Sequence, residues 1–408
     1  MSRVLVDSGI GYLGNIPSEW NIFRIKNAFK CKKNIVNDNW SNTQLLSLTT
    51  SGVKEKDIDN PNGKLPDSFN GYQYVEINNI IMCLFDLDCS AVFSGISKYN
   101  GMISPAYKVL KCKEIMNPDY AGYYFNYISF DRKYMHYSKN IRYTLNYDEF
   151  SSLPMLIPPK EEQKRIAQYL DRQCVKIDQT IEDNKREIEL LQELNEQIIL
   201  NEINKYNQIK LKYILKDGKS MRVGPFGTQL TNKDYVDDGY WVYNQRVVLD
   251  NNYTTNDTFI TQKKYEEMES FKVQSGDILL TTRGTIGRIS IVPTTYKAGI
   301  LHPCIIKFNV KNYDEDLLKY IFNETNYIKE QLQLMSNSTT IDVVYSYNLR
   351  EVLLPNIEYI EQKKLVANLN RRCSKLKKVM KYRQKIIEKL EEYKRSLIYE
   401  CVTGKREV

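Results

Sequence analysis

Histidines, paired cysteines and long apolar runs are scarce or missing in this sequence of 408 residues. Only His136 and His302 are present, which excludes a histidine-rich metal site and a duplicated histidine base. The eight cysteines form no Cys-x-x-Cys pair, so neither a zinc site nor a disulfide scaffold is indicated, and we expect reduced thiols. No apolar run is long enough to cross a bilayer, and the first residues lack the apolar core of a signal peptide. We therefore expect a soluble, cytoplasmic protein.

Complete catalytic motifs are missing as well. The stretch 217–220 ends like a phosphate-binding loop, but Tyr213 stands where the earlier glycine belongs, so we interpret it as a turn. The Asn-Pro-Asp-Tyr stretch at 117–120 resembles the Asn-Pro-Pro-Tyr of adenine methyltransferases, yet it lacks the second proline and a Gly-rich strand before it. Asn117 is therefore predicted to cap a helix, with Pro118 in the first turn. We expect no catalytic residue, no metal ligand and no cofactor in this chain.

The sequence does contain an internal duplication. Lys160 to Ile203 and Tyr359 to Val402 are two stretches without Pro or Gly that align at a shift of 199 positions without gaps. The matched pairs include Glu162 with Glu361, Gln163 with Gln362, Lys164 with Lys363, Leu170 with Leu369, Arg172 with Arg371, Cys174 with Cys373, Ile188 with Ile387 and Leu191 with Leu390. A period this long indicates two duplicated halves rather than a solenoid.

Both stretches have the apolar spacing of a coiled-coil seam, with alternating steps of four and three residues. The first seam consists of Leu170, Cys174, Ile177, Ile181, Asn184, Ile188, Leu191, Asn195 and Ile198. The second consists of Leu369, Cys373, Leu376, Met380, Arg383, Ile387, Leu390, Lys394 and Leu397. A stripe this narrow does not stabilise a lone helix, so each helix needs a partner.

The charges of the two stretches suggest which partner that is. The first stretch has 7 Lys and Arg against 11 Asp and Glu, net −4, and the second has 13 against 5, net +8. Unlike helices attract, so we predict that the two helices of one chain pack on each other, antiparallel. Asn184 and Asn195 either fix the register of this seam or mark places where the seam drifts to the surface. The whole chain has a net charge of +8, which is only a modest pointer to nucleic acid.

The remaining sequence follows one plan twice, and the length favours two or three domains. The predicted segments are a globular unit over 1–157, a long helix over 158–206, a second globular unit over 207–356 and a second long helix over 357–408. In the first unit we predict a strand or helix start at 21–26, loops over 47–66, strands at 72–77 and 80–85, and a helix at 119–130. In the second unit we predict a strand after Gly276, a loop over 283–288, a strand at 289–292 and a helix over 314–334. Ile25-Lys26 matches Leu211-Lys212, and Gly101 to Pro105 matches Gly299 to Pro303.

Three motifs, together with the duplicated plan, make the whole chain resemble the specificity subunit of a type I restriction-modification enzyme. They are Pro-Pro-x-x-Glu-Gln at Pro158 to Gln163, Gly-Pro-Phe-Gly-x-Gln-Leu at Gly224 to Leu230, and Gly-Asp-Ile-Leu-Leu-x-x-x-Arg-Gly-x-x-Gly at Gly276 to Gly287. The chain departs from this pattern at the second long helix, which lacks the double proline. It also departs in the first unit, where Asp86-Leu87-Asp88-Cys89 stands in place of the Arg-Gly loop.

The resemblance implies an α+β fold in which two target recognition domains each read one half of a split, asymmetric double-stranded DNA site. Two long coiled-coil helices with internal pseudo-two-fold symmetry would set the spacing and dock two modification (methyltransferase) subunits. Adenine-N6 methylation and ATP-dependent cleavage would be carried out by these and by restriction/translocase subunits, which use S-adenosylmethionine, ATP and Mg²⁺. Two alternatives remain: a coiled-coil scaffold that binds proteins and not DNA, and a self-contained modification enzyme.

Candidate DNA contacts combine basic or amide side chains with glycines or tyrosines. Glycines let the backbone approach DNA, Arg can fork onto guanine or phosphate, and amides suit adenine. The candidates in the second unit are Arg283, Gly284, Thr285 and Arg288, then Thr228, Gln229 and Lys233, then Asn244 and Arg246 of the stretch Asn244-Gln245-Arg246. Those in the first unit are Lys98, Tyr99, Lys139 and Arg142. The alternative interpretation is that these are ordinary turns with solvated side chains and that many of the 31 tyrosines belong to the core.

Overall fold

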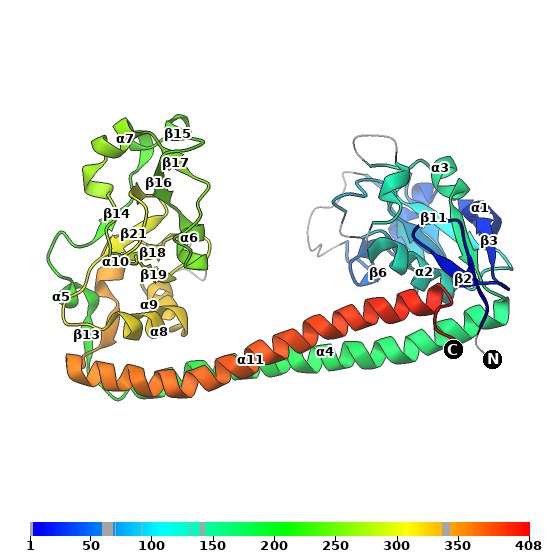
Figure 1. Cartoon of the computed structure of the whole chain (residues 1–408). Coiled ribbons are helices and arrows are strands. Elements are labelled where there is room, and N and C mark those ends of the chain that lie inside the picture. The colour runs from blue at the N-terminus through cyan, green and yellow to red at the C-terminus, as the bar shows by residue number, and fades with distance from the viewer. Residues whose placement is uncertain are drawn as a thin grey trace. The chain divides into compact units, whose positions relative to one another are not determined.

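The computed structural model describes residues 3–58, 68–69, 71–90, 92–130, 132–138, 143–336 and 343–408. The chain divides into two compact units, unit 1 with residues 1–184 and 385–408, and unit 2 with residues 185–384. Each unit contains a globular part and one end of each of two long helices, α4 (Lys160–Ile203) and α11 (Tyr359–Val402) (Figure 1). The two predicted long helices are thus confirmed.

The globular part of unit 1 is a mixed helix and strand structure. Its strands are β1 (Leu5–Asp7), β2 (Asn15–Pro17), β3 (Asn21–Arg24), β4 (Phe29–Lys32), β5 (Leu46–Thr49), β6 (Gly52–Glu55), β7 (Gln73–Val75), β8 (Ile80–Met82), β9 (Ser94–Ile96), β10 (Gly101–Ile103), β11 (Lys108–Cys112) and β12 (Pro154–Ile157). Its helices are α1 (Ile25–Ala28), α2 (Pro118–Phe130), α3 (Tyr147–Ser152) and the 3-10 turns η1 (Asn37–Asn42) and η2 (Met135–Tyr137). The central sheet is antiparallel with the order β4-β11-β8-β9.

The globular part of unit 2 has the same kind of central sheet. Its strands are β13 (Gln208–Lys210), β14 (Arg222–Val223), β15 (Tyr235–Val236), β16 (Tyr240–Tyr243), β17 (Phe259–Ile260), β18 (Ile278–Thr281), β19 (Ile289–Ile291), β20 (Gly299–Leu301), β21 (Ile305–Phe308) and β22 (Leu353–Pro355). Its helices are α5 (Leu211–Ile214), α6 (Gln245–Asp250), α7 (Gln262–Glu267), α8 (Glu315–Asn323), α9 (Tyr327–Ser336), α10 (Ser346–Glu351) and the 3-10 turns η3 (Gly227–Gln229), η4 (Asn232–Asp234) and η5 (Glu269–Phe271). The sheet order is β14-β21-β18-β19, again antiparallel, so each strand has its counterpart in unit 1.

Glycines confirm the predicted match between Gly101 to Pro105 and Gly299 to Pro303. Gly101 opens β10 and Gly299 opens β20, and neither has room for a side chain. A Cβ atom would lie 2.4 Å from the Gln44 carbonyl oxygen at Gly101 and 2.3 Å from the Trp241 carbonyl oxygen at Gly299. The same close approach of two backbones is thus required in both units.

The glutamine of the Pro-Pro-x-x-Glu-Gln motif joins each long helix to its globular part. Gln163 is fully buried, accepts a hydrogen bond from the Asn117 N–H at 2.8 Å, and donates to the carbonyls of Ile115 and Pro158 at 2.9 Å each. Asn117 in turn caps α2, as predicted, by accepting from the Tyr120 N–H at 2.9 Å.

Unit 2 repeats this arrangement without the double proline. Gln362 is fully buried, accepts from the Asp314 N–H at 2.6 Å, and donates to the carbonyls of Asn312 at 3.2 Å and Ile357 at 2.7 Å. Asp314 caps α8 by accepting from the backbone N–H groups of Asp316 and Leu317. The missing prolines therefore leave the attachment of α11 unchanged.

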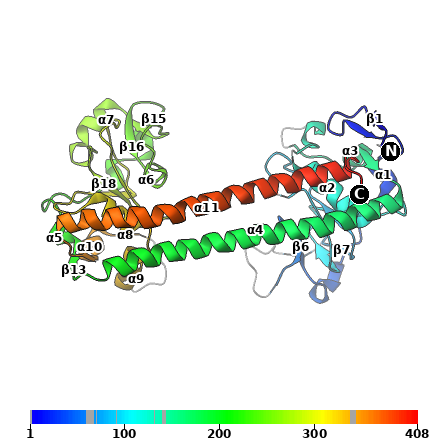
Figure 2. The same cartoon turned by 60° about the horizontal axis from the view of Figure 1, so that its bottom comes forward.

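The burial of the seam residues confirms the predicted seam of the long helices within each unit; Figure 2 shows the ribbons of α4 and α11. All nine seam residues of α4 and all nine of α11 are at least half-buried. Ion pairs join the acidic helix to the basic one, with Asp178 and Lys394 at 2.6 Å in unit 1 and Glu187 and Arg383 at 2.8 Å in unit 2. In unit 2, Glu202 further along α4 pairs with Arg372, which lies earlier on α11, so the helices run antiparallel as predicted.

The polar seam residues do not lie at the surface. Asn184 is 5 % exposed and donates to the Thr180 carbonyl of its own helix at 2.7 Å. Asn195 is 3 % exposed and donates to the Glu324 carboxylate at 3.2 Å. The interpretation that the seam drifts to the surface at these positions is therefore wrong, and a role in fixing the register stays a prediction.

Two local predictions are wrong. Residues 46–55 are not loop but a hairpin of β5 and β6, because Leu46, Leu48 and Val53 alternate into the core on either side of a tight turn at Gly52. The helix predicted over 314–334 is interrupted after Asn323. Glu324 contacts Asn195 and Lys377 of the long helices, and the Asn326 N–H donates to Glu196, so these contacts replace a continuous helix.

Candidate nucleic-acid interface

The loop between β18 and β19 contains the Arg-Gly motif, and hydrogen bonds from a buried threonine at its start fix its backbone. Thr281 is fully buried, and its hydroxyl donates to the Thr285 carbonyl at 2.5 Å and accepts from the Arg288 N–H at 3.1 Å. Gly284 and Gly287 have φ values of +61° and +76°, which other residues adopt only with strain. Thr281 therefore fixes the backbone of the loop, while Arg283, Gly284 and Thr285 are exposed.

The two arginines of this loop differ in role. The Arg288 guanidinium donates to the Asn323 carbonyl, and the Asn323 side chain bonds the backbone of Ile289, so Arg288 ties the loop to the end of α8. Arg283 is exposed, and its side chain has no hydrogen-bond or ion-pair partner within the described part of the chain. Arg283 is thus the arginine available to a ligand.

A second predicted stretch leaves the sheet at the same end of the strands as the Arg283 loop. β14 and β18 both pair antiparallel with β21, so both end beside its start. The Gly224 N–H donates to the Ile305 carbonyl at 2.9 Å, and the Thr282 N–H donates to the Cys304 carbonyl at 3.0 Å. The Gly224 to Lys233 stretch and the Arg283 loop therefore start from neighbouring positions.

Within that stretch, the three candidates are not equivalent. The Gln229 side chain accepts from the Phe226 N–H at 3.0 Å and closes a local turn. Thr228 and Lys233 are exposed. Next to Lys233, hydrogen bonds from Thr231 and the ion pair with Lys264 lower the pKa of Asp234 to about 2. The stretch thus presents Thr228 and Lys233 on a fixed loop, while Gln229 is structural.

The third stretch, at the start of α6, corrects the choice of residue. Asn244 caps α6, accepting from the Val247 N–H at 3.2 Å, and Arg246 pairs with Asp257 at 3.3 Å and Asp250 at 3.7 Å. The residue between them, Gln245, belongs to the predicted stretch but was not chosen as a contact residue. Its amide has no hydrogen-bond partner within the described residues, although it is half-buried.

Gln245 lies against the Arg-Gly loop. A Cβ atom added to Gly284 would lie 3.2 Å from Nε2 and 3.7 Å from Oε1 of Gln245. The missing side chain at Gly284 therefore leaves the space in which the Gln245 amide lies, next to the residue that follows Arg283. The signal in the sequence was the capping pattern: an Asn before Gln-Arg-Val-Val-Leu is a helix cap, which leaves the next amide free.

The candidates of unit 1 are not gathered in this way. Lys98 and Tyr99 follow β9, which places them at the end of the sheet opposite to the loop after β8. Lys98 is exposed, while Tyr99 packs on the core formed by Val75, Ile81 and neighbouring residues. Lys139 and Arg142 lie outside the described residues.

The described residues contain no group of three His, Cys, Asp or Glu side chains that would hold a metal ion, and none of their helices is long and apolar enough to span a membrane. His302 packs beside Gly224, and its Nδ1 accepts from the Cys304 N–H at 3.1 Å, so this side chain is engaged within the fold.

Comparisons with known proteins bear on the fold. Neither a scan against protein-family models nor a search of curated proteins gave a match. Among solved structures, a chain from work on the complex assembly and conformational transition of the type I R-M system is 12 % identical, with a TM-score of 0.64. The alignment covers 96 % of this chain and 99 % of that one.

Two further structures are the HsdS subunit from Thermoanaerobacter tengcongensis and the type I restriction-modification S subunit from M. genitalium. The first is 12 % identical with a TM-score of 0.46, covering 96 % of this chain and 98 % of that one. The second is 13 % identical with a TM-score of 0.35, covering 94 % and 96 %. Over nearly its whole length the chain thus shares the fold of the chain from the type I R-M system.

Proposed function

We propose that this chain is the DNA sequence-specificity subunit of a type I restriction-modification complex. The observation that carries the proposal is that Gln245 lies against Gly284, next to the exposed Arg283, at the loop between β18 and β19 of a duplicated fold. A free guanidinium and a free amide beside a glycine supply what base-edge reading needs: Arg forks onto guanine, and Gln pairs with the N6 and N7 positions of adenine. Thr228 and Lys233 would contact the backbone from the neighbouring loop.

Each unit would read one half of a split site. Because the loops of the two units differ in sequence, the two half-sites would differ, and the site would be asymmetric. The antiparallel helices α4 and α11 would set the spacing and dock two modification subunits. Methyl transfer with S-adenosylmethionine, and restriction with ATP and Mg²⁺, would belong to the partner subunits, and this chain would be non-catalytic.

The coiled-coil scaffold without DNA specificity is the second candidate, because exposed apolar residues lie on the long helices. Val175 is 67 % exposed and Leu190 is 56 % exposed. Such residues suit protein docking, but they do not account for the free Gln245 and Arg283 pair. Docking of partners and DNA reading are therefore assigned to different surfaces of the chain.

The test is methylation mapping with variants of unit 2. Arg283→Ala and Gln245→Ala, each expressed with the modification subunits, should relax the bases of one half of the methylated motif and leave the other half unchanged. Each lost bidentate contact is worth about 1–3 kcal/mol of discrimination. Gln262→Ala, an exposed amide on α7, serves as the matched control. Motifs identical to wild type in both variants would refute this assignment.

A further inference from the structure

The duplication extends past α2 in unit 1 and past α8 into α9 in unit 2. With Asn117 matched to Asp314 at the two helix caps, a shift of 197 positions matches Phe125 with Phe322, both buried in the cores. The same shift matches Ser129 with Asn326 and Arg132 with Lys329. A cation therefore stands at the matched sequence position in both units, just after α2 in unit 1 and in the first turn of α9 in unit 2, although the sequences around it differ.

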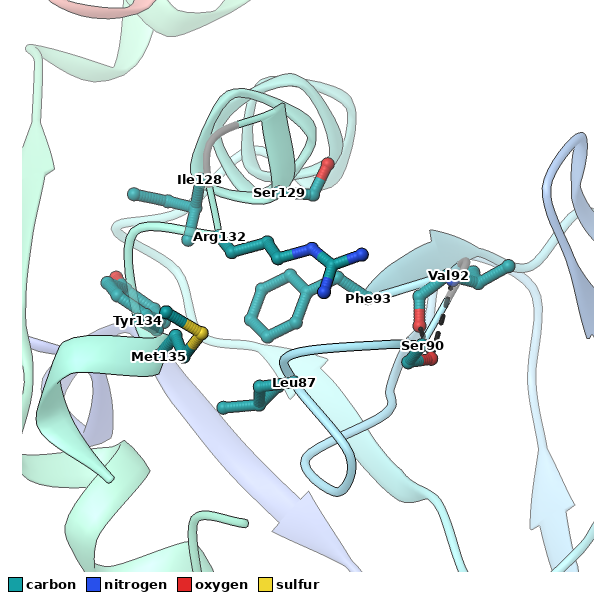
Figure 3. A pocket seen from close by; sticks show the side chains of 9 residues that line it. All are labelled: Leu87, Ser90, Val92, Phe93, Ile128, Ser129, Arg132, Tyr134 and Met135. Atoms are coloured by element: carbon teal, nitrogen blue, oxygen red, sulfur yellow. Dashed lines mark hydrogen bonds between the residues drawn. The ribbon is translucent and has the colours of Figure 1, made fainter. Parts of the chain in front are cut away.

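Each of these cations lies at a hollow. In unit 1 the hollow has a volume of about 80 Å³ between the loop after β8 and the end of α2 (Figure 3). Its lining comprises Leu87, Ser90, Val92, Phe93, Ile128, Ser129, Arg132, Tyr134 and Met135. The Arg132 side chain extends across the hollow above the Phe93 ring, with its guanidinium on the side of Ser90 and Val92 (Figure 3).

Unit 2 has a hollow in the corresponding place, between the loop after β18 and the end of α8. Its volume is about 440 Å³. Its lining comprises Gly284, Thr285, Ile286, Gly287, Arg288, Phe322, Thr325, Asn326, Lys329 and Gln333. Ser129 lines the hollow of unit 1 and the matched Asn326 that of unit 2. Arg132 and Lys329 correspond in the same way. Two units with different loops thus retain the same hollow with a cation in it.

Each hollow is lined by a basic side chain and, among the described residues, by no acidic one. Carboxylates lie next to the linings, since Asp86 and Asp88 flank Leu87 in unit 1 and Glu196 accepts from Asn326 in unit 2. Arg132 and Lys329 are exposed, and neither side chain has a hydrogen-bond or ion-pair partner in the part of the chain that the structure describes. The hydroxyl of Thr285 adds a neutral donor at the rim in unit 2, whereas the hydroxyls of Ser90 and Ser129 in unit 1 already donate to the carbonyls of Val92 and Asn126.

The backbone of Arg132 supports a functional reason for this residue. Arg132 has a φ of +50°, a conformation that costs free energy for a residue with a long side chain. Glycine or asparagine would be less strained here. In addition, the unit 1 loop offers Asp86 and Asp88 where unit 2 has arginines, so the cation of unit 1 must come from another segment.

We propose that each hollow binds one backbone phosphate of DNA, with Arg132 as the charge partner in unit 1 and Lys329 in unit 2. The inference rests on the proposed function. Gly284 connects the two sites, since it lines the hollow and also faces Gln245. A phosphate held by Lys329 would therefore fix the register of the base edges read by Gln245 and Arg283.

The test uses the full chain in complex with its modification subunits. Binding to a labelled duplex of mixed sequence and to a duplex carrying the mapped motif is measured over a series of salt concentrations. Arg132→Gln and Lys329→Gln should each lower the slope of log K against log salt by about one, since each removes one phosphate contact. Affinity should fall by the same factor for both duplexes, so that the preference for the motif is unchanged. Lys54→Gln in unit 1 and Lys263→Gln in unit 2 are exposed controls of equal charge change.

The outcomes separate this inference from the proposed function. If the wild-type complex binds DNA with a steep salt dependence but Arg132→Gln and Lys329→Gln keep the wild-type slope, the phosphate assignment is wrong and the proposed function stands. A loss confined to the motif duplex would also overturn it, because the hollows would then read bases. If the wild-type complex shows no salt-dependent DNA binding, both fail. Thermal unfolding of each variant checks that it folds, and Arg132→Lys should restore the slope.

Discussion

Removal of the Gln163 or Gln362 side-chain amide tests whether its hydrogen bonds attach each long helix to its globular part. Gln163→Ala deletes one acceptor and two donor bonds at once. It leaves the Asn117 N–H and the carbonyls of Ile115 and Pro158 without their partner. The side chain is fully buried, so water does not reach these groups without rearrangement.

The magnitude follows from the number of orphaned groups. Each buried polar group without a partner costs about 1–3 kcal/mol, and three such groups, partly relieved by relaxation, give a loss of roughly 3–5 kcal/mol. Gln163→Glu should be nearly as costly, because a carboxylate accepts from the Asn117 N–H but does not donate to two carbonyls. Gln362→Ala should cause a comparable loss in unit 2.

Hydrogen exchange measured by mass spectrometry is the appropriate assay, because a chain of two units need not unfold in one step. Gln163→Ala should speed exchange in α2 and at the start of α4, while Gln362→Ala should do so in α8 and at the start of α11. Gln197→Ala, an exposed glutamine on α4, is the control and should be close to neutral. A local loss below about 1 kcal/mol for Gln163→Ala would refute the reasoning.

Two further predictions concern stability. Gly101→Ala and Gly299→Ala should each lower the free energy of unfolding by about 1–3 kcal/mol or more in denaturant unfolding, because the new Cβ meets a backbone carbonyl. Gly11→Ala, where a Cβ has open space, is the control and should be neutral or stabilising. Equal effects at all three sites would contradict this reasoning. Burial lowers the pKa of His302 below its usual 6.5, so the folded state binds fewer protons than the unfolded state. Stability is then kept above pH 6.5 and falls as the pH drops below it. His302→Asn, which keeps an acceptor for the Cys304 N–H, should flatten the fall in thermal stability over this acidic range, and an unchanged pH profile would show that His302 is not its source.

The repeated elements were predictable because their signals are periodic. The four-and-three spacing determined both long helices, and opposite net charges of the two stretches indicated the antiparallel pairing that Asp178 with Lys394 and Glu187 with Arg383 now show. The matched glycines Gly101 and Gly299 were found for a similar reason: both are required by the same backbone approach.

Local structure that depends on distant partners was not predictable. The break after Asn323 arises from contacts of Glu324 and Asn326 with residues about 130 positions earlier, which no local pattern reveals. The hairpin of β5 and β6 was hidden by its polar turn residues, because only the alternation of Leu46, Leu48 and Val53 marks it.

The candidate site was predictable as a loop but not as a set of side chains. The Arg283 to Arg288 loop was identified from its glycines, yet its sequence does not tell which arginine is free and which is bound to the Asn323 carbonyl. Within the predicted stretch Asn244-Gln245-Arg246, Gln245 is singled out only by its position beside Gly284, which lies 39 residues later in the chain. Arg132 emerges only when the two units are compared element by element.

The central claim is that this chain decides where DNA is methylated, and modified-base sequencing of DNA from cells with and without the gene tests it most directly. We expect adenine methylation at a split, asymmetric motif that disappears when the gene is deleted and returns when it is restored. An unchanged methylation pattern on deletion, in cells shown to express the modification subunits, would contradict the account and favour the scaffold.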